Sequence, residues 1–108
     1  MKKYVPVKES AAATHLCIET YYSLGGMNYF TGAIENRGYY LSVSPVTKSR
    51  GMESFAAFSG IKKCIKPVPR KSAKAEAEAE KIAADFIPAL VKYVCTYNGL
   101  EIDESEAI

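Results

Sequence analysis

The spacing of apolar residues changes once along the chain, at Ser72, and this change constrains the fold more than any other feature. Before Ser72, several segments alternate apolar and polar residues, which is the period-two pattern of half-buried strands. After Ser72, apolar residues recur at threes and fours, the pattern of one helix face. These residues are Ala75, Ala79, Ile82, Ala83, Phe86, Leu90, Val94 and Tyr97. The pattern predicts strands followed by one long amphipathic helix.

The predicted helix has a start, an interruption and a stop. Ser72 is an N-cap candidate, and the pair Asn98 and Gly99 supplies a left-handed C-cap. Pro88 lies between them and removes one backbone hydrogen bond at a cost of about 3 kcal/mol or more, so we expect a kink.

The length of this helix leads to a hypothesis about assembly. Residues 72–98 would span about 40 Å as a helix, whereas the strands span roughly 20 to 30 Å, so one half of the helix should overhang its sheet. The inner face of that half carries Ala75, Ala79 and Ala83. Small residues permit close approach of another helix or a sheet, although alanine is also simply the best helix former. We therefore expect a homodimer in which the overhang packs on a second copy.

The segments before the helix differ in how clearly they alternate. Residues 14–22 and 39–46 are the clearest strands, with Pro45 marking an end or an edge position, and residues 52–58 form a further strand. Residues 60–68 fit either a strand or a helical turn. The expected fold class is α+β: an antiparallel sheet of three to four strands followed by one long, kinked C-terminal helix packed on one face.

A length of 108 residues fits a single domain. We expect an extended lead-in at residues 1–12, one α+β domain at 13–100 and an acidic flexible tail at 101–108. Gly25 and Gly26 form a turn signal. Residues 27–31 are then a return strand, or residues 25–38 are one long aromatic loop.

Motifs for catalysis and for cofactor or metal binding are missing. His15 is the only histidine, the three cysteines are far apart without CxxC spacing, and the stretch GGMNYFTG lacks both nucleotide fingerprints. We predict no catalytic residue, no cofactor, no metal and no enzymatic activity; a small enzyme with a pocket across a dimer interface is the last alternative. No signal peptide or membrane span is visible, which predicts a cytoplasmic protein without a membrane partner.

Aromatic and basic residues indicate a binding surface. Neighbouring strand residues point to opposite faces, so if the helix covers the face of Tyr39, then Tyr21 and Tyr40 lie on the open face. Bases are concentrated in residues 48–74 of a chain with a net charge of +2. Exposed aromatic rings beside Lys and Arg bind single-stranded nucleic acid, although tyrosines are also enriched in dimer interfaces. The predicted binding residues are Tyr21, Tyr29, Phe30, Arg37, Tyr40, Lys48, Arg50, Lys62, Lys63 and Lys66.

Several stretches of the chain have a distinctive composition, namely GGMNYFTG, RGYYLSVSPV, AFSGIK and KSAKAEAEAEKIAADF. In these stretches the chain resembles small proteins, without an assigned activity, of phages and conjugative elements of gut Firmicutes. The resemblance implies a bacterial or phage cytoplasm and an accessory role. The expected order of elements is also similar, in topology only, to the PC4-like single-strand DNA-binding architecture, which is a homodimer.

The sequence thus supports two functional hypotheses. The first is a non-enzymatic, dimeric accessory protein that binds single-stranded DNA or RNA through the open sheet face and the basic residues 48–74. The alternative is a protein-binding accessory factor or inhibitor encoded by a mobile element, which acts through the aromatic loop of residues 25–38.

Overall fold

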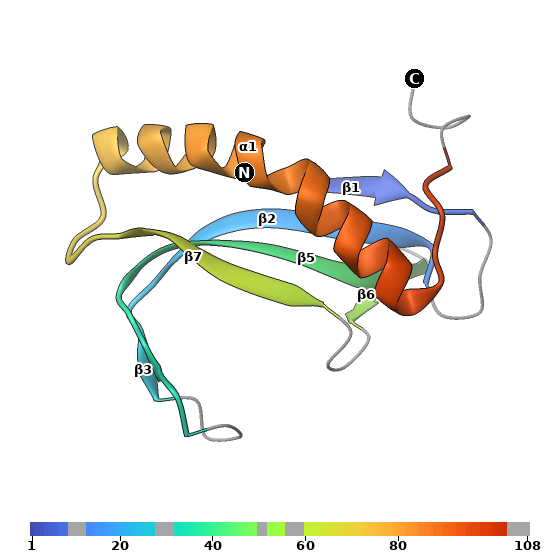
Figure 1. Ribbon diagram of the computed structural model, residues 1–108, viewed down its shortest axis with the longest axis horizontal. Helices are drawn as coiled ribbons and strands as arrows, with labels where there is room; N and C mark the ends of the chain where they lie inside the picture. Colours follow the sequence, from blue (N-terminus) through green and yellow to red (C-terminus); the bar gives the residue numbers. More distant parts are fainter. Residues whose placement is uncertain (9–12, 28–31, 50–51, 56–59, 104–108) are drawn as a thin grey trace.

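The computed structural model describes residues 1–8, 13–27, 32–49, 52–55 and 60–103. An antiparallel sheet carries one long helix on one of its faces, and a two-stranded ribbon projects from one end of the sheet (Figure 1). The predicted α+β class, with the helix at the C-terminal end, is confirmed.

The main sheet is built around one long central strand. Its strands are β1 (Lys2–Pro6), β2 (His15–Ser23), β5 (Gly38–Ser49), β6 (Met52–Phe55) and β7 (Ile61–Pro67). The order is β1-β2-β5-β6, and β7 pairs with the same edge of β5 as β6 does. β7 pairs with residues 38–43 of β5, whereas β6 pairs with residues 46–49. The sheet is therefore four strands wide, as expected, although five strands contribute to it.

The structure decides two points that the sequence leaves open, the conformation of residues 61–67 and the position of Pro45 in its strand. Residues 61–67 form a strand, which decides between the two alternatives for that part of the chain. Pro45 does not end its strand, because β5 continues to Ser49. Pro45 pairs with Leu16 of β2 and lies between the residues that pair with β7 and those that pair with β6. A proline has no N–H to donate, so this gap at the outer edge suits it.

The ribbon consists of β3 (Gly26–Met27) and β4 (Ile34–Glu35), which are antiparallel. Gly25 and Gly26 have φ values of 74° and 121°. They do not form the turn of a hairpin; they lead the chain from β2 into the ribbon. A side chain at Gly25 would place its Cβ 2.6 Å from the carbonyl oxygen of Glu35, which explains the glycine. Of the predicted return strand at 27–31, only Met27 lies within the described residues.

The helix α1 (Ala73–Asn98) has the predicted caps. The Ser72 Oγ accepts a hydrogen bond of 3.0 Å from the N–H of Ala75. Gly99 adopts the left-handed conformation, with φ 66° and ψ 34°, and its N–H reaches the carbonyl groups of Cys95 and Thr96. Pro88 lies inside the helix, and Figure 1 shows that the helix axis changes direction near its middle.

The expected overhang of the helix is wrong. Ala75, Ala79 and Ala83 are buried in the core of their own chain. The sheet is long enough to cover them because β5 has 12 residues, which is about 40 Å of extended chain. The small side chains let α1 approach its own sheet. The alanine face is therefore covered by its own sheet and does not support a homodimer.

The apolar stripe of the helix is narrower than the spacing predicted. Beyond Pro88 it runs through Leu90, Val91 and Val94, which pack against the core. The spacing places Tyr97 in the stripe, but 68% of its surface is exposed. Its ring stacks on the ring of Tyr93 at the surface.

Both ends of the described chain join the domain. The predicted lead-in contains β1, which pairs with β2 along its full length. Val7 forms a bridge to Ile102, and the N–H of Lys8 donates to the carbonyl oxygen of Glu101 at 2.8 Å. The start of the predicted flexible tail is thus held against β1, while residues 104–108 lie outside the described residues.

Candidate functional site

The open face of the sheet, which lies opposite α1, carries a pair of stacked tyrosines. Tyr21 of β2 and Tyr40 of β5 are register partners. Their ring centroids are 5.8 Å apart, with an angle of 18° between the planes. The Nζ of Lys62 lies 5.8 Å from the centroid of the Tyr40 ring. Tyr21 and Tyr40 share the open face, as the alternation predicted. The structure adds Lys62 to this face, because residues 61–67 form a strand in which Lys62 pairs with Ser42.

Tyr40, however, is not an exposed platform. Only 4% of its surface is accessible, and its hydroxyl donates a hydrogen bond of 2.6 Å to the carbonyl oxygen of Asn36. Burial, followed by the neighbouring Cys64, raises the pKa of Tyr40. Tyr21 is half-buried, and burial raises its pKa as well. The predicted exposure of Tyr40 is wrong, because its ring packs against Tyr21 and its hydroxyl is bonded to Asn36, just before β5.

An ion pair connects the ribbon to the open face. The Nζ of Lys62 on β7 lies 2.7 Å from the Oε1 of Glu35 on β4. The hydrogen bond to Glu35 is the main cause that raises the pKa of Lys62. The charge of Lys62 is thus matched inside the molecule, which reduces its value for binding a phosphate.

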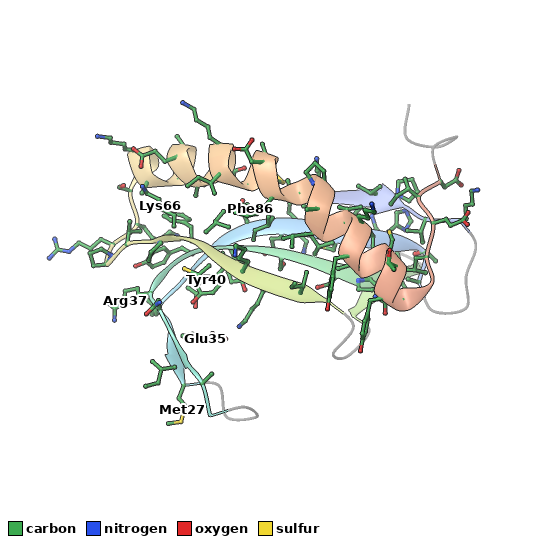
Figure 2. The ribbon with its side chains drawn as sticks, viewed as in Figure 1. Met27, Glu35, Arg37, Tyr40, Lys66 and Phe86 are labelled. Atoms are coloured by element: carbon green, nitrogen blue, oxygen red, sulfur yellow. The ribbon has the colours of Figure 1, made fainter. Side chains whose placement is uncertain are left out.

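The other predicted basic residues do not form one surface. Lys63 and Lys66 lie on the helix side, where the Nζ of Lys63 is 5.2 Å from the Phe86 ring centroid and the Nζ of Lys66 is 2.6 Å from Glu78 Oε2 (Figure 2). The hydrogen bond from Lys66 lowers the pKa of Glu78.

Lys48 extends from β5 toward Tyr4 on β1. Its Nζ is 3.9 Å from the centroid of that ring. Three further predicted residues, Tyr29, Phe30 and Arg50, lie outside the described residues. The predicted site therefore divides into a group around Tyr21, Tyr40 and Lys62, a separate cation at Lys48, and two lysines beside the helix.

Three aliphatic side chains on the ribbon and at its base are exposed, and none of them is among the binding residues predicted from the sequence. Leu24, Met27 and Ile34 are 72%, 59% and 85% exposed. Met27 and Ile34 are register partners, and Figure 2 shows that Met27 and Glu35 lie on the part that projects away from the sheet. One signal in the sequence could have identified these three residues. They are apolar residues in a segment flanked by glycines, and no core position is predicted for them.

Arg37 lies where the ribbon returns to the sheet. Its Nε donates to the carbonyl oxygen of Leu24 at 3.3 Å, and its side chain is exposed. Within the described residues Arg37 has no ion pair, whereas Glu35 is paired with Lys62. The described part of the ribbon and its base therefore presents apolar side chains next to an unmatched positive charge.

A cavity of about 320 Å³ lies beside β2 near the start of α1. It is lined by Thr20, Tyr21, Tyr22, Tyr39, Lys71 and Glu76. The hydroxyl of Tyr22 donates to the carbonyl oxygen of Val68 at 3.3 Å, and that of Tyr39 donates to the carbonyl oxygen of Ser72 at 3.2 Å. These bonds hold the walls of the cavity in place.

The described residues offer no cluster of three or more His, Cys, Asp or Glu that could hold a metal ion. Cys17 is buried, Cys64 and Cys95 are half-buried, and all three are free thiols. Burial raises the pKa of Cys95. In the part of the chain that the structure covers, no helix is long and apolar enough to cross a membrane.

Comparison of the chain with protein-family models, with curated proteins and with solved structures finds no match.

Proposed function

We propose that this protein is a non-enzymatic accessory domain that binds another protein through the ribbon β3–β4. The observation that supports this most directly is the exposure of Met27 and Ile34 on the projecting ribbon and of Leu24 at its base. Exposed aliphatic residues gathered on one element are typical of interaction sites, because their contact with water is costly. An accessory role in a bacterial or phage cytoplasm is part of the proposal.

The chemistry of the ribbon selects the kind of partner. Three aliphatic side chains require an apolar groove. The charge of Arg37, which has no ion pair among the described residues, favours a groove with acidic residues at its rim. The ion pair between Lys62 and Glu35 holds the base of the ribbon against the sheet. A ribbon held in this way loses less conformational entropy on binding.

Affinity capture with matched variants tests this function. The wild-type chain and the double variant Leu24→Asp with Ile34→Asp would be used to capture proteins from a bacterial lysate, and each captured protein would be purified and measured by calorimetry. We expect a partner whose affinity falls at least about tenfold in the double variant, since a charge replaces each apolar contact. The control, Tyr93→Asp with Tyr97→Asp, alters exposed helix residues and should retain binding.

The proposal fails if purified partners bind the ribbon variant and the wild type equally well. It also fails if the helix variant loses as much affinity as the ribbon variant, because the site would then lie on α1.

Binding of single-stranded DNA or RNA to the open face is a second candidate, supported by Tyr21 and by Lys48 above Tyr4. Titration of a labelled oligo-dT at low and high salt tests it. We expect salt-sensitive binding that weakens in Tyr21→Ala and Lys48→Ala but not in Lys63→Ala, which changes the helix side. The absence of binding at low salt would contradict this second candidate.

A homodimer remains a further proposal, and light scattering over a range of concentrations tests it.

A further inference from the structure

We propose that β2 receives an additional strand from a protein partner: an extended acidic segment that pairs with the free edge of β2 and places a carboxylate in the cavity beside α1. The free edge is the edge of β2 that faces away from β5, beyond the end of β1. The inference depends on the proposed function, since it requires a protein partner, and it specifies how part of that partner binds.

Where β1 ends, β2 stays paired with β5, but no described strand pairs with its other edge. Lys2 pairs with Glu19, and the N–H of Thr20 donates to the carbonyl oxygen of Met1 at 2.8 Å. Alternate residues of an antiparallel strand direct both backbone groups to the same edge. Because Thr20 directs its N–H toward β1, Tyr22 directs its N–H and C=O to the same edge. Among the described residues, nothing pairs with them.

The other two long edges of the sheet are protected against strand addition. Edge strands that avoid pairing carry lysines and prolines. β1 and β7 do so, with Lys2, Lys3, Pro6, Lys62, Lys63 and Pro67. The free edge of β2 has Tyr21, Tyr22 and Ser23 instead. It lacks the residues that protect the other two edges.

The cavity lies directly beside this unpaired backbone. It is lined by Thr20, Tyr21 and Tyr22 of β2, by Tyr39 of β5, and by Lys71 and Glu76 near the start of α1. An added strand uses its backbone for affinity and inserts alternate side chains into pockets for specificity. A volume of about 320 Å³ is sufficient for one side chain. The free edge therefore offers backbone groups for pairing, and the cavity offers a pocket for one side chain of the added strand.

The charges around the cavity favour an acidic side chain. Arg70, Lys71 and Lys74 are exposed near the start of α1. Two acidic residues of this helix are already engaged, because Glu78 pairs with Lys66 and Glu80 with the N-terminal amine. Glu76 is the acidic residue that lines the cavity with Lys71. At the cavity itself Glu76 balances Lys71, so the positive excess comes from the exposed Arg70 and Lys74 near the start of α1. This excess attracts a carboxylate toward the cavity, where Lys71 can contact it.

The experiment uses a short synthetic peptide of alternating valine and threonine with one central glutamate, and a matched peptide with a central lysine. Binding to the full chain is measured by calorimetry, and exchange of the Tyr22 amide proton is measured by NMR. We expect the glutamate peptide to bind and to slow exchange at Tyr22. Lys71→Glu should weaken its binding at least about tenfold, because that cation faces the carboxylate.

Lys74→Glu is the matched control, since it changes the net charge equally at a residue that does not line the cavity. We expect it to weaken binding by less than about threefold, as for a screened surface charge. The inference is overturned if both variants weaken binding equally, if the lysine peptide binds as well as the glutamate peptide, or if neither peptide slows exchange at Tyr22.

These outcomes are separate from those that test the ribbon. If Leu24→Asp with Ile34→Asp abolishes partner binding while Tyr22 stays unprotected in the complex and with both peptides, the strand-addition inference fails and the proposed function stands. If the glutamate peptide protects Tyr22 but the ribbon variant binds every partner normally, the inference stands and the ribbon is not the site.

Discussion

Tyr40 stacks on Tyr21 across β2 and β5, yet only Tyr21 reaches the solvent. The two residues are adjacent on the same face but have different roles. Tyr40 is held by its hydrogen bond to Asn36 and supports the base of the ribbon. Tyr21 lines the cavity and remains available for contact. The open face is therefore part scaffold and part surface.

Removal of the Tyr40 ring should destabilise the fold. Tyr40→Ala is expected to lower the free energy of unfolding by about 3 kcal/mol, because it removes a buried aromatic ring. Tyr97→Ala, at an exposed position, should change it by less than about 0.5 kcal/mol. Urea unfolding measures both values. Equal effects would show that Tyr40 is not part of the packed structure.

The N-cap of α1 should contribute measurably to stability. Ser72→Ala removes the acceptor for the Ala75 N–H and is expected to cost about 1 kcal/mol. Ser72→Asp keeps an acceptor oxygen and should restore most of the loss. Thermal and urea unfolding followed by circular dichroism provide the test. A Ser72→Ala chain as stable as the wild type would contradict the capping role.

Gly38 should not tolerate a side chain. A Cβ at this position would collide with the backbone of Lys66 and Pro67 in β7, so Gly38→Ala is expected to destabilise by more than about 1 kcal/mol. Gly26→Ala is the matched control: its φ of 121° is also unfavourable for alanine, but nothing lies within 4 Å of its Cβ. Gly38→Ala should therefore be the more damaging change in urea unfolding.

Stability should fall at alkaline pH. Burial raises the pKa of Tyr40 above its ordinary value of 10.0, so the unfolded chain releases this proton first. The contribution is complete below pH 10.0 and is lost as the pH rises through the pKa of the folded state. Lys62, whose pKa is raised above 10.5 by Glu35, acts in the same direction.

Urea unfolding at a series of pH values from about 9 to 11 tests this dependence. Tyr40→Phe should show a smaller fall over that range than the wild type, because the titrating hydroxyl is absent. Tyr97→Phe is the control and should follow the wild type. A Tyr40→Phe chain that loses as much stability as the wild type would show that Tyr40 does not cause the fall.

Much of the local structure was readable from the sequence. The helix start at Ser72, its C-cap at Gly99 and the shared face of Tyr21 and Tyr40 all follow from short-range rules. The same rule separates Lys62 from Lys63 once residues 61–67 are known to be a strand. The sequence leaves that segment open between strand and helical turn and so predicts the basic residues as one surface. This part of the predicted site is wrong.

The sequence by itself determined the fold class, the helix caps and the alternation of strand faces, because these depend on backbone preferences and side-chain spacing over a few residues. Only the tertiary structure decided that Tyr40 is buried, that the alanine face covers its own sheet, and that β1 ends opposite Glu19. Among the described residues, the edge of Tyr22 that faces away from β5 is therefore left without a partner. These features depend on which distant segments meet and in which register. That choice is the sum of many weak contacts across the whole chain, and no short stretch of sequence contains it.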